Sequence, residues 1–142
     1  MGYYSRSIKD VIEDIGTGDY YLPAIQRKFV WKPQQIEGLF DSIIKGYPIG
    51  TFLFWDVRKP HINDYVFYKF IQEYHEKNNY RNEITPSPKM KDNITGVLDG
   101  QQRLSSMYIA LQGSYSYKKK YLSWNNPNAF PARRLHVDIL GE

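Results

Sequence analysis

Residues 96–106 constrain the fold most, because they combine an apolar run, a tight turn and a helical period. Val97 and Leu98 are typical of a short strand, and Asp99 with Gly100 is typical of a turn. Apolar residues then recur at the spacing of one helix face, at Leu104, Met107, Tyr108 and Leu111. The sequence therefore predicts a strand, a turn and a helix in direct succession.

The start of this predicted helix carries residues suited to binding an anion. The first turn of a helix has unpaired backbone N–H groups and a partial positive charge. Gly100 would let a phosphate approach the backbone, and Arg103, one turn in, would add a forked, charged contact. The Asp99 carboxylate could hold a magnesium ion or orient a water molecule.

A purely structural interpretation of the same residues also stays open. In it, Asp99 caps the helix and Gly100 only makes the turn. The short pattern D-G-x-x-R occurs by chance in many chains. However, nothing about starting a helix calls for two adjacent amides, and Gln101 and Gln102 stand in the turn.

Periodicity and the positions of glycine and proline predict the other elements. In chain order we expect a helix over residues 7–16, ended by Gly16, a strand over 20–22, a helix from Pro33 to Gly46 and a buried strand over 51–57. We then expect a helix near 64–77, a loop over 78–93 and a last strand over 135–140. This last strand would place His136 and Asp138 on one face. We interpret these two residues as solvent-facing rather than as a metal pair, because a third ligand is not apparent.

Two further segments have the composition of nucleic-acid contacts. Residues 24–31 carry an amide, a guanidinium and an indole at Gln26, Arg27 and Trp31, although a surface loop with a packed Trp31 fits equally. The lysines 118–120 lie between tyrosines, a mixture that binds phosphates and stacks on bases, and that also occurs in solvated hairpins. We predict DNA contacts at Trp31, Lys118, Lys119 and Lys120.

Composition bounds the class of protein. The 142 residues are enough for one domain, and 42% of them are hydrophobic. The chain contains no cysteine, which excludes disulfides and thiolate metal sites. It has no apolar run of the roughly 18 residues that a membrane span needs, and its start is unlike a signal peptide. We therefore expect a cytoplasmic protein without a membrane partner, and the net charge of +4 permits nucleic-acid binding.

Three blocks in this order resemble the N-terminal domain of the GmrSD-type, modification-dependent (type IV) restriction endonucleases. They are L-P-A-I-Q-R-K-F-V-W at residues 22–31, L-F-D-S-I with G-Y-P-I-G within residues 39–50, and V-L-D-G-Q-Q-R-L at residues 97–104. The resemblance covers roughly residues 7–140. That domain is related to the ParB/sulfiredoxin-like nucleotide-binding domains.

The resemblance implies a fold and a site. The fold would be an α/β (α+β) ParB-like domain, with a small mixed sheet and packed helices. The D-G-Q-Q-R motif is associated in the family with binding and hydrolysis of a nucleoside triphosphate with Mg²⁺. Asp99 and Arg103 would be catalytic, Asp99 would be the magnesium ligand, and nucleotide would bind at Gly100, Gln101, Gln102, Arg103, Gln26 and Arg27. Ile25 stands where the family often has an aromatic, and Ser105 replaces a usual threonine.

The resemblance also implies a role in defence against foreign DNA. The expected function is nucleotide-dependent sensing of DNA, including modified DNA, within a restriction system. The alternative is a non-catalytic module that binds nucleotide or DNA, or docks a subunit, and a sulfiredoxin-like phosphate-handling enzyme is disfavoured. Family proteins run to several hundred residues and often end in an HNH-type nuclease domain. This chain has no H-N-H pattern, so we expect that it does not cut DNA by itself. We expect one domain, which would be a fragment of a longer protein, a truncated gene product or one part of a split system.

Overall fold

The computed structural model describes residues 2–24 and 28–141. Within these ranges lie three α-helices, α1 (Ile8–Thr17), α2 (Pro33–Ile44) and α3 (Gln101–Leu111). The strands are β1 (Tyr20–Pro23), β2 (Leu53–Arg58), β3 (Phe67–Tyr68), β4 (Glu73–His75), β5 (Ile84–Thr85), β6 (Asn93–Asp99), β7 (Ser114–Ser116) and β8 (Ala132–Arg133). Short 3-10 helices are η1 (His61–Asp64), η2 (Ser87–Met90) and η3 (Pro127–Ala129). The prediction of a small α+β domain is confirmed.

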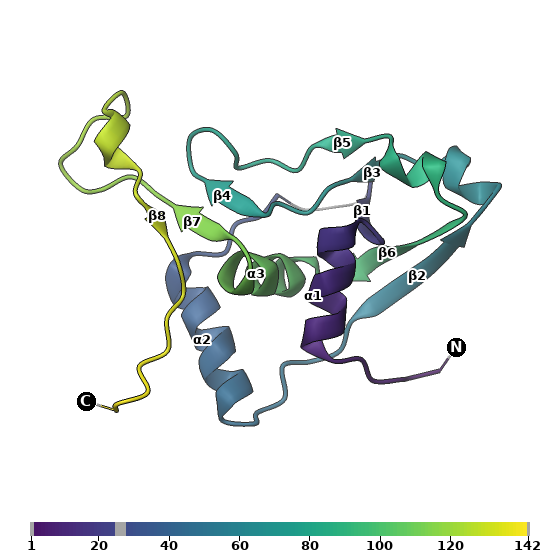
Figure 1. Cartoon of the computed structure of the whole chain (residues 1–142), viewed down its shortest axis with the longest axis horizontal. Coiled ribbons are helices and arrows are strands. Elements are labelled where there is room, and N and C mark those ends of the chain that lie inside the picture. The colour runs from purple at the N-terminus through teal and green to yellow at the C-terminus, as the bar shows by residue number, and fades with distance from the viewer. Residues whose placement is uncertain (1, 25–27, 142) are drawn as a thin grey trace.

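The described strands form two mixed sheets. The larger sheet has the order β2-β6-β1-β3-β5, with β1 parallel to β6 and the other pairs antiparallel. The smaller sheet has the order β4-β7-β8, with β4 parallel to β7. Figure 1 shows α3 near the centre, between α1 and α2, with the smaller sheet at one end of the molecule. No helix in the described part of the chain is long and apolar enough to cross a membrane.

Helix α1 forms as the sequence predicts, except at its end. The Ser7 side chain caps it by accepting from the backbone N–H of Asp10 at 3.1 Å. Its apolar face, buried at Val11, Ile12 and Ile15, packs into the core. The helix ends at Gly18, in the left-handed conformation with φ +81°, and not at Gly16, because Gly16 is still within the helix.

Helix α2 also begins and ends close to its predicted bounds. Pro33 is its first residue, where a missing N–H costs nothing. The Gln35 side chain accepts from the backbone N–H of Lys32 at 2.8 Å, which satisfies a donor at the helix start. Ile36 and Leu39 are its buried residues, so α2 covers the core with a narrow stripe.

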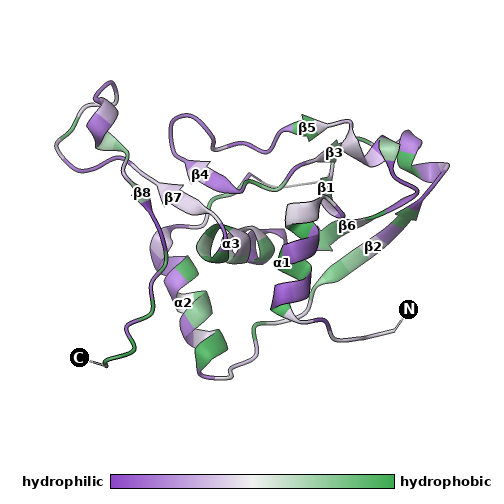
Figure 2. Cartoon of the chain, in the orientation of Figure 1, coloured by the Kyte–Doolittle hydropathy of each residue, from purple (hydrophilic) through white to green (hydrophobic). Residues whose placement is uncertain are grey.

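The predicted strand, turn and helix are β6, Gly100 and α3. Leu104, Met107 and Tyr108 of the predicted face are buried, whereas Leu111 is nearly half exposed. Ser105, Ser106 and Ile109 are buried as well, because α1 and α2 both pack against α3. Figure 2 shows apolar positions around much of α3, in contrast to the sharp alternation along α1. A helix buried on several sides holds its first turn firmly in place.

Three clusters of buried side chains make the core. The first joins α1, α3, β1 and β6, and includes Val97 and Leu104. The second lies between β1, β2, β6 and η1, and includes Tyr21 and Ile94. Because neighbouring residues of a strand point to opposite faces, Tyr20 in the first cluster and Tyr21 in the second place these clusters on opposite faces of the larger sheet. The third cluster contains Phe29, Ile36, Ile71 and Ile109 and lies beside α2.

The strand predicted over 51–57 exists as β2, but it is not fully buried. It lies at the edge of the larger sheet, paired only with β6 among the described strands. Of its six residues only Val57 is buried, and Leu53 is 44% exposed. The continuous run of apolar and aromatic residues therefore predicts the strand correctly but its burial wrongly, because an edge strand can carry the same run.

The predicted helix near 64–77 is wrong. Phe67 pairs with β1 and β5 in the larger sheet, whereas Tyr74 pairs with β7 in the smaller one. The chain crosses between the sheets at Phe70 and Ile71, which are buried in two different clusters. The apolar residues thus fit helical spacing by coincidence, because each contacts a different part of the molecule. The predicted loop over 78–93 also contains the short elements β5 and η2.

The predicted last strand over 135–140 is also wrong. These residues form no strand, although their apolar and polar residues alternate. Val137 is 61% exposed and Ile139 is 88% exposed, so the alternation covers no core within the described residues. The last strand is instead β8, paired with β7. His136 and Asp138 are exposed, as expected.

Candidate functional site

The turn between β6 and α3 has a geometry that depends on glycine. Gly100 has φ +88°, and a Cβ placed there would lie 2.2 Å from Cδ1 of Phe52. The Asp99 Oδ1 atom accepts from the backbone N–H of Gly100 at 2.9 Å. Asp99 is exposed and is not the helix cap, because Gly100 takes the N-cap position and no described side chain caps α3. The N–H groups of the first turn therefore have no side-chain cap within the described residues.

The side chains of both glutamines of the motif form hydrogen bonds with backbone groups. Gln101 Nε2 donates to the carbonyl of Val97 at 2.8 Å, which ties the helix to the end of its own strand. Gln102 Nε2 donates to the carbonyl of Lys28, and its Oε1 accepts from the N–H of Val30, both at 3.0 Å. A glutamine can donate and accept at once, so Gln102 matches a backbone segment as a neighbouring strand would.

Arg103 binds a second remote loop. Its two terminal nitrogens donate to the carbonyls of Ile49 and Thr51, each at 2.7 Å. The guanidinium also lies 4.3 Å from the centre of the Phe52 ring. Gly50 allows this approach, since a Cβ there would lie 2.7 Å from the arginine Nη1 atom. The fork that the sequence assigns to a phosphate is thus directed, in this structure, at two backbone carbonyls.

The adjacent residues Gln102 and Arg103 therefore join the three sequence blocks of the resemblance. Gln102 holds the segment that ends in Trp31, and Arg103 holds the segment that ends the G-Y-P-I-G block. The Tyr115 hydroxyl adds a third bond by donating to the carbonyl of Trp31 at 2.9 Å. Burial raises the pKa of Tyr115, so this hydroxyl stays protonated at neutral pH. The blocks meet at the start of α3.

The structure treats the other predicted contact residues unequally. Gln26 and Arg27 lie outside the described residues. The half-buried Trp31 packs against the first and third core clusters, so its indole has a structural role. Lys118 Nζ donates to the carbonyls of Lys119 and Leu122 at 3.1 and 2.8 Å, whereas Lys119 and Lys120 are exposed. The three lysines therefore do not form a uniform patch.

Asp99 is isolated as a metal ligand. The described residues contain no cluster of three or more histidine or acidic side chains that could hold a metal ion. A single exposed carboxylate suits Mg²⁺ only where phosphate oxygens and water complete its shell. The residues present therefore fit a magnesium ion that arrives with a nucleotide better than one bound by the protein alone.

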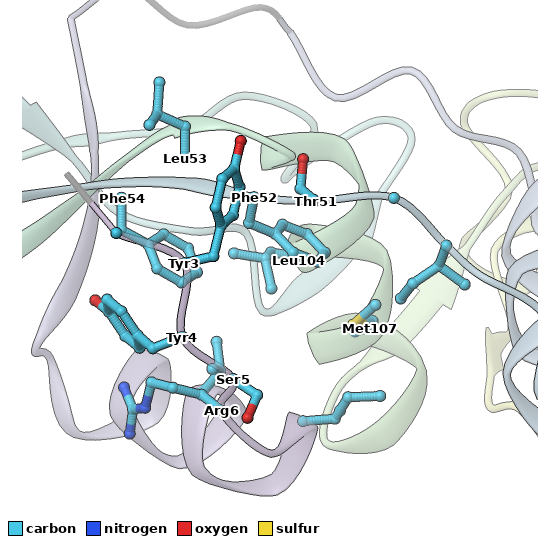
Figure 3. A pocket seen from close by; sticks show the side chains of 15 residues that line it. Tyr3, Tyr4, Ser5, Arg6, Thr51, Phe52, Leu53, Phe54, Leu104 and Met107 are labelled. Atoms are coloured by element: carbon cyan, nitrogen blue, oxygen red, sulfur yellow. The ribbon is translucent and has the colours of Figure 1, made fainter.

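A cavity of about 660 Å³ opens beside the turn. Its walls come from the N-terminal segment with Tyr4, from α1, from the chain that enters β2 with Phe52 and Phe54, and from α3 with Leu104 and Met107, of which Figure 3 shows the labelled side chains together. Phe52 contributes both to this wall and to the support of Arg103. The cavity and the start of α3 are thus neighbours that share one aromatic ring.

Sequence reasoning found the motif but missed its partners. Ile49, Thr51 and Tyr115 are separated by long stretches of chain from the groups they bind. The available signal was the pair of glycines, Gly50 and Gly100, because both have positive φ and both contact the arginine or its supporting ring. Two such glycines near one arginine indicate a close backbone approach.

Comparisons with known proteins bear on the family to which the chain belongs. Over 130 residues the chain is 29% identical to an uncharacterized protein of Methanocaldococcus jannaschii, a match that covers 92% of this chain and 20% of that protein. The chain thus spans about a fifth of the length of that relative. Residues 8–136 match the sequence model of the family described as GmrSD restriction endonuclease, N-terminal domain. The match includes both glycine turns, α3 and all three strands of the smaller sheet, and the chain belongs to this family of restriction endonuclease N-terminal domains.

Proposed function

We propose that this chain is a nucleotide-dependent DNA-sensing domain of a modification-dependent restriction system, with a role in defence against foreign DNA. Its family connects it with restriction. The observation that carries the nucleotide part is the start of α3, where no described side chain caps the helix and Asp99 stands beside the turn. Cleavage of DNA would come from a nuclease domain or subunit outside this chain.

The first turn of α3 would hold the phosphates. The N–H groups of a helix's first turn and the helix dipole favour an anion, and Gly100 leaves the backbone uncovered. A guanidinium has five N–H groups, and the two carbonyl contacts of Arg103 use only two of them. Arg103 can therefore brace the loop and still contribute positive charge at the rim of the site.

Asp99 would hold Mg²⁺ and the reacting water. Its Oδ1 atom accepts from Gly100, which fixes the carboxylate next to the helix start. A bound Mg²⁺ would supply charge neutralisation for the phosphates. Without a cation, the negative charge of Asp99 would repel the triphosphate bound at the adjacent helix start, so nucleotide binding should depend on Mg²⁺.

The neighbouring cavity would take the nucleobase. Its volume of about 660 Å³ falls in the range of small-molecule sites, and its walls are largely apolar and aromatic. Phe52 and Phe54 lie nearly parallel there, with ring centres 6.1 Å apart. A flat base could stack on these ring faces, and Phe52 also contacts Arg103 at the proposed phosphate site.

The test uses Asp99→Asn, because asparagine keeps the oxygen that accepts from Gly100. We expect nucleotide affinity, measured by calorimetry with Mg²⁺ across ATP, GTP, CTP and UTP, to change by less than about tenfold. Hydrolysis should fall by roughly 10²-fold or more, the scale for losing a positioned catalytic group. Asp92→Asn is the matched control, since Asp92 directly precedes β6, at the end of the strand opposite Asp99, and its side chain is 96% exposed.

A specific observation also favours a non-catalytic module. The hydrogen bonds described above for Gln101, Gln102 and Arg103 go to backbone groups of this chain, as expected of residues that only build a fold. If the wild-type chain binds nucleotide but releases no phosphate, with or without DNA, the module is the better description. If no nucleotide binds, the nucleotide part of the proposal is wrong.

A further inference from the structure

Two loops leave the smaller sheet together and form what we name the basic loop pair, residues 76–83 and 117–131. They are joined directly: Lys77 Nζ donates to the carbonyl of Trp124 at 2.8 Å, and Glu76 accepts from the N–H of Lys118 at 2.7 Å. Figure 1 shows both at the end of the molecule that carries β4, β7 and β8. They contain five basic and two acidic side chains, and one of those acids, Glu76, is bound to backbone.

Two lysine side chains hold the longer loop in shape by donating hydrogen bonds to its backbone carbonyls. Lys118 Nζ binds the carbonyls of Lys119 and Leu122, which closes the chain around its own ammonium. Lys77 fixes the far side of the same loop at Trp124. A loop held by charged hydrogen bonds at two points presents its tip in a defined way.

The tip of the longer loop carries an aromatic ring that the other described residues leave fully exposed. Tyr121 is 100% exposed, and its φ of +68° makes it the one described non-glycine residue with positive φ. This conformation is rare for a bulky residue. Trp124, 47% exposed, lies three residues further along the loop, with its ring centre 5.5 Å from that of Phe130. The loop thus holds a ring in solvent directly after the exposed Lys119 and Lys120.

We propose that the basic loop pair binds single-stranded or locally opened DNA, with Tyr121 stacking on an exposed base and Lys119 and Lys120 contacting phosphates. Lys77 and Lys118 are positioning residues that shape the loop. This inference rests on the DNA-sensing function proposed above and adds the contact surface, the stacking residue and the strand state. The combination of positive charge and aromatic rings matches sequence-tolerant binding of single strands, whereas an intact duplex covers its base faces.

The test measures fluorescence anisotropy with a labelled twelve-nucleotide oligothymidylate and with a duplex of the same length. Tyr121→Asn removes the ring and suits the left-handed conformation, so the loop should keep its shape. We expect it to weaken single-strand binding by about 5- to 150-fold, the equivalent of one lost stacking contact. Tyr121→Phe should bind as the wild type does. Tyr47→Asn is the control, because Tyr47 is 61% exposed on a different part of the surface.

The lysines give an independent readout. Lys119→Ala and Lys120→Ala should each flatten the slope of log affinity against log salt by about 0.7 for a single strand. The inference is overturned if Tyr121→Asn binds the single strand like the wild type, if Tyr121→Phe loses as much as Tyr121→Asn, or if an RNA of equal length binds better than DNA. If the wild-type chain binds neither DNA probe, the DNA-sensing function fails as well; wild-type binding that Tyr121→Asn leaves unchanged refutes this inference alone.

Discussion

Replacing Arg103 tests whether the motif arginine braces the fold. Its partly buried bond to Ile49 is a charged donor meeting a backbone carbonyl, a class that contributes about 1.5–3 kcal/mol. The exposed bond to Thr51 adds about 1 kcal/mol, and the contact with the Phe52 ring adds roughly 0.5–1 kcal/mol. Arg103→Ala should therefore lower the free energy of unfolding by about 3–5 kcal/mol.

Thermal unfolding followed by circular dichroism measures this loss. For a domain of this size the expected fall in Tm is on the order of 10 °C. Arg103→Lys should recover only part of it, because an ammonium cannot fork to two carbonyls. Arg58→Ala is the control, since the Arg58 ion pair with Asp56 is exposed and should cost less than about 1 kcal/mol. If Arg103→Ala unfolds within about 2 °C of the wild type, the bracing role is refuted.

Three other substitutions test the packing and charge of the fold. Gly113→Ala should cost about 1–3 kcal/mol in urea unfolding, because a Cβ there would lie 1.7 Å from the carbonyl oxygen of Gln72; a neutral result would contradict this packing. Ser106→Ala should be neutral or raise Tm, since the buried Ser106 hydroxyl has no hydrogen-bond partner among the described residues; a clear loss of stability would refute the reasoning. The hydrogen bond from Lys91 holds the pKa of Asp19 below its ordinary value, so this pair stabilises the fold above about pH 4 and the contribution is lost as pH falls through the lowered pKa. The Tm difference between wild type and Asp19→Asn should therefore be present at pH 7 and vanish in strong acid, and a difference that persists there would contradict the assignment.

The elements that the sequence predicts correctly are those whose signals are local. α1 has its Ser7 cap and an apolar face, and α2 has Pro33 at its first position, so neighbouring residues determine both. The turn at Gly100 has a local signal as well, because its positive φ favours glycine, although the Phe52 ring also leaves no room for a Cβ there. Each of these can be recognised within one or two helical turns of chain.

The elements that the sequence misses depend on remote partners. Phe67 and Tyr74 lie seven residues apart, as in a helix, yet they pair with strands of different sheets. Val137 and Ile139 alternate as in a strand, yet no described strand pairs with them. Tertiary pairing overrides local periodicity in the first case, and its absence leaves the periodicity without effect in the second.

The candidate site shows the same division. The residue types at Asp99, Gly100 and Arg103 could be selected from sequence, because each suits phosphate or magnesium chemistry. The carbonyls that Arg103 binds could not, since the loop with Ile49 and Thr51 lies about fifty residues earlier and a carbonyl has no sequence signature. The same limit hid the difference between Lys118, which binds its own loop, and the exposed Lys120.

The proposed function depends above all on nucleotide phosphates binding at the first turn of α3. The most direct measurement is a titration of the wild-type chain with Mg²⁺ and nucleoside triphosphate, followed by the backbone amide signals in a two-dimensional NMR spectrum. We expect the largest shifts at the N–H groups of Gly100, Gln101, Gln102 and Arg103, with smaller shifts around the Phe52 cavity. Saturating shifts confined to another part of the chain, or none with any of the four nucleotides, would contradict the proposed function.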